Sequence, residues 1–228
     1  MPDSILRRVP LFADLSDSEI AALSSAFRRR RYTKGTLIHA SGAMGADLYV
    51  IESGPVTITL PSEHGQELTL ALLGPGDFFG ETSLIDEEPW YADAIAVADT
   101  MLLLLGKRDF IELLERRPKV MRRLLTIVSR RLRHNARFAQ DLAFLDVPTR
   151  LAQALVTLVE STGWGWSGEG ERPLTRVIDI TQSALAAHVG ATRESINKWL
   201  GYYERRGYIR RMRDRIEILS LDELRPQR

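Results

Sequence analysis

The sequence predicts an α+β protein in three parts, and three observations support that prediction. Short apolar runs alternate with glycines from Tyr32 to Leu105, a pattern typical of strands joined by turns. An apolar heptad pattern follows from Pro118 to Asp146. The last stretch has the spacing of two short helices followed by a hairpin. We therefore expect domains at residues 1–117, 118–146 and 147–228.

The composition is that of an ordinary globular protein, since 44% of the 228 residues are hydrophobic and 27% are charged. No apolar run approaches the roughly 18–20 residues that span a bilayer, and the start of the chain has no apolar signal core. The absence of cysteine excludes disulfides, thiolate-held iron–sulfur clusters and cysteine zinc sites. We expect a cytoplasmic protein with no membrane partner.

The first part combines helices with a β-rich region. Residues 4–27 have the pattern of short helical pieces, and Ser16 with Glu19 three residues later forms a capping-box pattern. The runs GTLIHASG, DLYVIESGPVTITL, ELTLALLGPGDFFGE and DAIAVADTMLLLL then predict strands at a spacing of about 8–12 residues. This spacing favours a β sandwich, roll or barrel.

The long helix carries an apolar seam that favours a partner helix. Two heptad rows form it, and the residues expected in a homodimer contact are Met121, Leu125, Val128, Leu132, Asn135 and Leu142. The alternative is a helix packed on its own β domain. Asn135 lies on the seam, where a buried Asn fixes register or faces a ligand.

Pro148 in DVPTR is expected to end the long helix, and a further helix is predicted at about 150–161. A Gly-rich loop, TGWGWSGEGERP, follows. Its Trp164 and Trp166 are expected to pack locally.

The C-terminal stretch has the spacing of a helix-turn-helix, whose second helix enters the major groove of DNA. Thr181 is a good N-cap for a helix that ends at Val189. Gly190 permits a tight turn, and Thr192 caps a second helix.

The second helix has two distinct faces at about 100° per residue. Ile196, Trp199, Leu200 and Tyr203 form an apolar face. The opposite face is polar and carries Arg193, Glu194, Asn197 and Lys198. Arg or Lys suits a guanine edge, and Glu suits a cytosine edge. The alternative is the polar face of any amphipathic surface helix.

The stretch after this helix strengthens the DNA-binding interpretation. RRGYIRRMRDRIEIL predicts two short strands around Arg213, Asp214 and Arg215, a basic hairpin suited to phosphate contacts. From Ile180 onward ten Lys or Arg stand against six Asp or Glu, although the whole chain has a net charge of only +1. The residues expected at a DNA surface are Thr181, Gln182, Ser183, Thr192, Arg193, Glu194, Asn197, Lys198, Arg213 and Arg215.

Four motifs in order resemble the CRP/FNR family of bacterial transcription regulators: VPLFADLSDSEIAAL, GPGDFFGE, LAFLDVPTRLAQAL and VGATRESINKWLGYYERRGYI. The resemblance covers nearly the whole chain. It implies a homodimer with a sensory β-roll of jelly-roll type, a long dimerisation helix and a winged helix-turn-helix, with double-stranded DNA and RNA polymerase as partners. Arg193, Glu194 and Lys198 match the family's base-reading positions. Arg is commoner at the last of these, and Lys lacks its bidentate fork.

The resemblance also indicates an altered effector pocket. In cyclic-nucleotide-binding members a Gly-Glu pair is followed about ten residues later by an arginine, which takes the cyclic phosphate, and a small hydroxyl residue. Gly80 and Glu81 match the pair, but Tyr91 and Ala92 stand at the two later positions and Asp93 adds a negative charge. Asn135 stands where the family places a base-contacting hydroxyl. The expected pocket residues are Gly80, Glu81, Thr82, Trp90, Tyr91, Ala92 and Asn135.

These departures predict that cyclic AMP does not bind in its usual pose. One alternative is a different effector, such as a cyclic dinucleotide or an uncharged or cationic metabolite, and a regulator that responds to a cyclic nucleotide also stays open. The other is no effector, with Trp90 and Tyr91 filling the pocket. Haem is not expected, because no pair among the four histidines has ligand spacing. The sequence does not determine the effector, the target genes or activation against repression.

The sequence argues against two other classes of protein. A nucleotide-binding or scaffolding module would show no salt-dependent DNA affinity, and the basic hairpin argues against it. An enzyme is not expected, because the sequence has no P-loop, metal-ligand cluster, GxSxG motif or thiol nucleophile.

Overall fold

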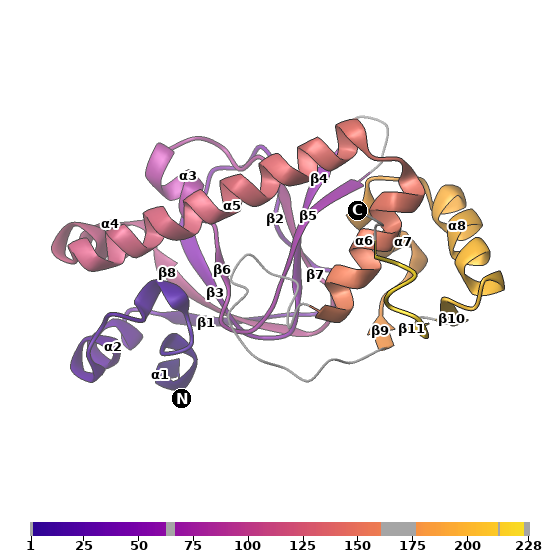
Figure 1. Ribbon diagram of the computed structural model, residues 1–228. Helices are drawn as coiled ribbons and strands as arrows, with labels where there is room; N and C mark the ends of the chain where they lie inside the picture. The colour runs from indigo at the N-terminus through magenta and orange to yellow at the C-terminus, as the bar shows by residue number, and fades with distance from the viewer. Residues whose placement is uncertain (1, 63–66, 161–176, 214, 226–228) are drawn as a thin grey trace. The chain divides into compact units, whose positions relative to one another are not determined.

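Two units make up the part of the chain that the computed structural model describes, residues 2–62, 67–160, 177–213 and 215–225 (Figure 1). The first unit consists chiefly of the N-terminal helices, two four-stranded sheets and the long helix as far as Arg133. Among the described residues, the second comprises Ser62, residues 67–70 and those from His134 onward, and it holds the C-terminal helices and a three-stranded sheet. The predicted Trp164/Trp166 loop and Asp214 lie outside the described residues.

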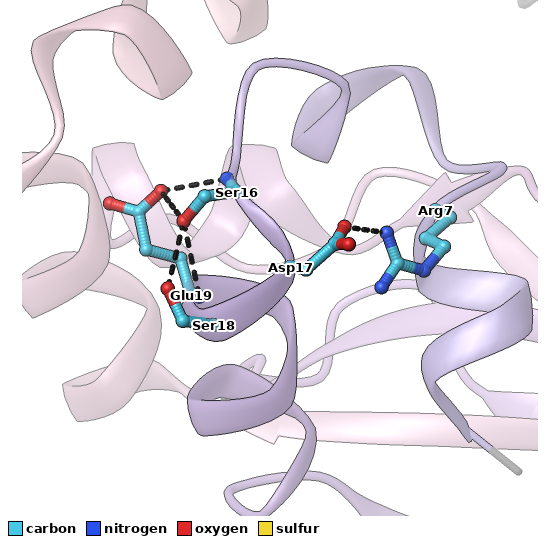
Figure 2. A network of polar contacts seen from close by, with 5 residues as sticks. All are labelled: Arg7, Ser16, Asp17, Ser18 and Glu19. Atoms are coloured by element: carbon cyan, nitrogen blue, oxygen red, sulfur yellow. Dashed lines mark hydrogen bonds and ion pairs between the residues drawn. The ribbon is translucent and has the colours of Figure 1, made fainter.

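The N-terminal helices are α1 (Pro2–Leu6), a 3-10 turn (Pro10–Phe12) and α2 (Asp17–Ser24). The predicted capping box begins α2: the Ser16 hydroxyl accepts from the backbone N–H of Glu19, and the Ser16 backbone N–H donates to the Glu19 carboxylate over 2.8 Å (Figure 2). These bonds satisfy amide groups that have no partner inside the helix. Arg7 forms an ion pair with Asp17 at the same helix start (Figure 2).

Two four-stranded sheets follow, as the alternating pattern predicted. One has the order β1 (Arg28–Tyr32), β8 (Thr100–Gly106), β3 (Asp47–Ser53), β6 (Phe78–Phe79). The other has the order β2 (Leu37–His39), β7 (Asp93–Ala96), β4 (Val56–Pro61), β5 (Glu67–Leu73). Buried and partly buried positions alternate along β5 and β7, which is how a strand covers a core with one face.

Strand β1 was missed by the sequence prediction because it begins with four consecutive arginines. It is an edge strand, paired only with β8 among the described strands, and its four arginines are exposed. Three of them meet carboxylates: Arg28 pairs with Asp47, Arg29 with Glu52 and Arg31 with Asp99, over 2.5–2.7 Å. A charged edge strand resists pairing with other chains.

Helix α5 (Pro118–Phe144) buries one face and exposes another. Val120, Leu124 and Ile127 lie in the core of the first unit, beside strand residues such as Leu103 and Leu105. Of the predicted dimer seam, Met121, Leu125 and Leu132 are 41%, 63% and 68% exposed, whereas Val128 is partly buried against that core. The helix therefore packs on its own β domain and still presents an unpartnered apolar stripe.

The short helices α3 (Glu81–Asp86) and α4 (Lys107–Arg116) complete the first unit. The second contains α6 (Val147–Glu160), α7 (Gln182–Val189) and α8 (Arg193–Arg205), with the sheet order β10 (Ile209–Met212), β11 (Arg215–Ile218), β9 (Val177–Asp179). Helix α6 begins three residues earlier than predicted. Its Pro148 lies in the first turn, where the missing N–H costs no helical hydrogen bond.

Candidate functional site

Local sequence signals build the α7–α8 pair. Thr181 caps α7 by accepting from the Ala184 N–H over 3.2 Å, and Gly190 ends it with a left-handed φ of 67°. Thr192 caps α8 by accepting from the Ser195 N–H, also over 3.2 Å. Each predicted cap is confirmed. Gln182 and Ser183 lie in the first turn of α7, where unpaired N–H groups favour phosphate oxygens.

Helix α8 is held by its apolar face and leaves its polar face free. Ile196, Leu200 and Tyr203 are buried in the core of the second unit, with Ile209 and Ile216 of the sheet. The exposed side chains of α8 include Arg193, Glu194, Asn197 and Lys198, the four that were predicted for the outer face. Trp199, which was predicted for the buried face, is only partly buried and packs beside Tyr202.

The hairpin β10–β11 lies next to α8 in the second unit (Figure 1). Arg211 of β10 donates to Glu204 of α8 over 2.7 Å and to Asn197 over 3.1 Å. Arg215 meets the carboxylate of Asp179 at 2.5 Å, so its charge is partly neutralised. Arg213 lies in the exposed turn of the hairpin. The two arginines expected to contact phosphate are thus in different electrostatic settings.

Sequence reasoning missed the residues that hold the helix-turn-helix to α6. The guanidinium of Arg150 donates to the carbonyls of Leu145, Val189 and Gly190 over 2.7–3.1 Å. It caps the C-terminal ends of α5 and α7 together, where a cation is favoured. The Tyr203 hydroxyl donates to the Pro148 carbonyl over 2.8 Å. An arginine two residues after the proline of DVPTR was a signal that could have been used.

In the first unit, Gly80 and Glu81 occupy the turn from β6 into α3. Gly80 has a φ of 93°, and an added Cβ would lie 2.9 Å from the carbonyl oxygen of Asp47. Only glycine fits such a backbone without strain. Glu81 is 3% exposed, and its carboxylate accepts from the Arg131 guanidinium over 2.6 Å. Arg131 also donates to the Phe78 carbonyl over 2.7 Å and lies over the Phe78 ring.

A small cavity opens beside this pair. Its lining comprises Ile58, Phe79, Gly80, Glu81, Thr82, Trp90, Tyr91 and Ala92. Six of the seven predicted pocket residues are therefore brought together; Asn135 belongs to the part of α5 in the second unit. The cavity volume of about 30 Å³ suits one or two water molecules. Small-molecule sites are typically about 300–1,000 Å³.

Aromatic side chains fill the space next to the cavity. Trp90 is 8% exposed, and its ring packs against His39, Tyr49 and Phe79 with centroids 4.1–5.9 Å apart. Its backbone is fixed by hydrogen bonds with Gly42 and Ala43, over 2.7 and 2.9 Å. These contacts leave Trp90 little freedom to move aside.

Tyr91 sits at the mouth of the cavity and is 50% exposed. Partial burial raises the pKa of its hydroxyl, and the neighbouring Glu81 carboxylate raises it further while Arg131 opposes the shift. The hydroxyl is therefore neutral at physiological pH. Asp93, which was expected to repel an anion, accepts from the Ser41 N–H over 2.6 Å. Among the described residues that line the cavity, Glu81 is the one with an ionisable carboxyl or basic group.

Metal-binding clusters and membrane-spanning helices are both absent from the described residues. No group of three or more His, Cys, Asp or Glu residues is placed to hold a metal ion. No described helix is both long and apolar enough to cross a membrane.

Comparison with known proteins matches each unit to a family. The family model for a cyclic nucleotide-binding domain matches residues 29–117, and the model for a Crp-like helix-turn-helix domain matches residues 149–226. The CRP-like cAMP-activated global transcriptional regulator of Mycobacterium tuberculosis is 34% identical over 91% of both chains. The cyclic AMP receptor protein of Thermus thermophilus is 38% identical over 88% of both chains.

The fold is also similar to solved structures. A transcriptional regulator of the CRP/FNR family from Thermus thermophilus superposes with a TM-score of 0.69 at 30% identity. The match covers 86% of this chain and 96% of that one.

Proposed function

The chain belongs to the CRP/FNR family of transcription regulators, which are not enzymes, and we propose that it binds a palindromic DNA site as a homodimer without needing cyclic AMP in its usual pose. The exposed polar face of α8 supports the DNA-reading part of this proposal. Arg193, Glu194 and Lys198 lie on one solvent-facing side of a helix whose other side is buried. In this arrangement Arg193 suits a guanine edge and Glu194 a cytosine edge.

The exposed stripe on α5 supports the homodimer. Met121, Leu125 and Leu132 are 41–68% exposed although they are large and apolar. A second copy of α5 would cover them at coiled-coil spacing. Two recognition helices related by two-fold symmetry then read half-sites about 34 Å apart. RNA polymerase is the further partner that the family resemblance implies.

The sensory cavity supports the effector part of the proposal. A cyclic phosphate needs a cation in the lining, and the cation nearest to Glu81, Arg131, is already paired with it. The cavity is also smaller than a nucleotide. We therefore propose that Tyr91 replaces the phosphate-binding arginine of the relatives. The alternative is a ligand that displaces Tyr91, because this half-exposed side chain can move without opening the core.

DNA binding is tested with the purified protein and duplexes selected from a random pool. Arg193→Ala should lower affinity for the selected palindrome by about 5- to 150-fold per half-site, the worth of one good base contact. Arg116→Ala on α4 removes the same charge far from α8 in sequence and is the matched control. Equal binding by Arg193→Ala and the parent at 150 mM salt (roughly physiological) would show that α8 does not read the site.

The effector proposal is tested by titration calorimetry with cyclic AMP, cyclic GMP and cyclic di-GMP. The parent should bind none of them in the micromolar range. The double variant Tyr91→Arg, Ala92→Ser supplies a cation and a hydroxyl, and it should gain cyclic AMP affinity. Micromolar binding of cyclic AMP by the parent, together with tighter DNA binding, would contradict the proposal and favour a cyclic-nucleotide-responsive regulator.

A further inference from the structure

Arg211 of the hairpin contacts two side chains on the recognition helix. Its Nε donates to a Glu204 oxygen over 2.7 Å, and its backbone N–H donates to the other Glu204 oxygen over 2.9 Å. One terminal nitrogen then donates to Oδ1 of Asn197 over 3.1 Å. Glu204 and Arg211 are partly buried, whereas Asn197 is exposed.

The spacing along α8 makes room for this contact. Asn197, Gly201 and Glu204 are four and then three residues apart, so they share one face of the helix. Gly201 has no side chain, and an added Cβ there would lie 3.9 Å from a terminal nitrogen of Arg211. The guanidinium thus crosses over Gly201 between its two partners.

Glu204 is the anchor of the arrangement. Hydrogen bonds from the Arg211 backbone and then from its side chain lower the pKa of the Glu204 carboxyl, so the carboxylate is charged at neutral pH. The anchored Nε fixes the plane of the guanidinium. The remaining nitrogens are then held in a set direction, which a lysine could not reproduce.

The chemistry of arginine determines how the Asn197 amide is turned. A guanidinium carries five donors and no acceptor, so only the amide oxygen of Asn197 can face it. The amide nitrogen must point away from Arg211. An Asn that recognises adenine needs both groups, because its oxygen accepts from N6 while its nitrogen donates to N7.

We propose that Arg211 is a positioning residue that fixes Asn197 as a hydrogen-bond donor toward DNA. Asn197 then selects an acceptor edge, such as guanine N7 and O6 or thymine O4, and discriminates against bidentate adenine recognition. This inference rests on the proposed function, in which α8 enters the major groove. It assigns sequence selectivity to a hairpin residue that need not touch the DNA.

The test compares base preferences of the full-length parent and variants by sequencing duplexes bound from a randomised pool. Asn197→Ala identifies the base pair at which discrimination depends on Asn197. At that base pair Arg211→Lys should raise the relative affinity for adenine by about fivefold, the low end of one base contact. Preferences that depend on Arg193 should stay as in the parent. Glu204→Gln weakens the anchor and should shift the same base pair in the same direction.

Three outcomes would overturn the inference: no position-specific effect of Asn197→Ala, an equal loss of affinity for all sequences in Arg211→Lys, or an unchanged preference in both Arg211→Lys and Glu204→Gln. Thermal unfolding of each variant shows whether it is folded, and the preference shift is scored on the variants that are. Failure of the proposed function is separate, since the parent itself would then select no sequence from the pool.

Discussion

The guanidinium of Arg131 lies 2.6 Å from the carboxylate of Glu81, and the two side chains are 8% and 4% exposed. Arg131 comes from α5 and Glu81 from the start of α3, so the pair ties the long helix to a residue that lines the small cavity. A buried ion pair contributes modestly to stability when intact, but removal of one partner leaves an uncompensated buried charge.

Removal of the arginine alone should therefore be costly. Arg131→Met is expected to lower the free energy of unfolding by about 3–5 kcal/mol, because Glu81 then stays buried without its cation. Urea denaturation followed by circular dichroism measures this, at one protein concentration because dimer formation would otherwise change the midpoint.

The matched control is the double variant Arg131→Met, Glu81→Leu. Removal of both charges should recover most of the loss, to within about 2 kcal/mol of the parent. If the double variant were as unstable as the single one, the loss would come from packing and not from the stranded carboxylate.

Gly45 marks a close approach beside Trp90. A Cβ added there would lie 2.3 Å from the Ser83 hydroxyl and 2.7 Å from the Trp90 indole nitrogen. Gly45→Ala should therefore cost about 1–3 kcal/mol through overpacking. Gly74→Ala is the control, because no atom lies within 4 Å of its added Cβ. A melting temperature lowered equally in the two variants would contradict the assignment.

His188 of α7 is expected to make the stability of the second unit depend on pH. It shares a cavity wall with His134, and burial together with that neighbour lowers the pKa of His188 to about 4. Between pH 4 and the unfolded value near 6.5 the unfolded chain binds more protons, so stability falls as the pH drops through this range. The free energy of unfolding should be about 2 kcal/mol lower at pH 5 than at pH 8 on account of this group.

His188→Gln removes the titrating group, and urea denaturation at pH 5, 6, 7 and 8 compares it with the parent. The variant should show a shallower loss of stability toward low pH. Its remaining loss is expected from His134, whose pKa burial also lowers. A slope equal to that of the parent would show that His188 takes up its proton equally in the folded and unfolded states.

Arg150 should hold the helix-turn-helix in place. Arg150→Ala leaves the carbonyls of Leu145, Val189 and Gly190 without their shared donor, and it should destabilise the second unit by about 2–4 kcal/mol. Hydrogen exchange of the α7 amides measures this locally. Arg137→Ala removes an equal charge from an exposed position of α5. It should change the free energy of exchange of the α7 amides by less than about 0.5 kcal/mol. Equal protection in the two variants would contradict the role of Arg150.

Several elements could be predicted from the sequence because their causes are local. The Ser16 capping box and the Thr181 and Thr192 caps each depend on a side chain and a backbone group three residues apart, and the Gly190 turn depends on the left-handed φ of a single glycine. The β1 strand could not be predicted in this way. Four consecutive arginines show no alternation of apolar and polar residues. Three of them pair with carboxylates that lie 19, 23 and 68 residues away along the chain, and these contacts form only when the chain folds.

The sequence by itself determined the family, the order of the parts and the two faces of α8, because these follow from residue spacing along one helix or strand. Only the tertiary structure decided which partners the charged side chains have. Arg131 meets Glu81 across fifty residues, Arg211 turns the Asn197 amide, and Arg150 joins two helix ends. A guanidinium reaches whichever acceptors the folded chain brings near it, and spacing along the sequence does not contain that information.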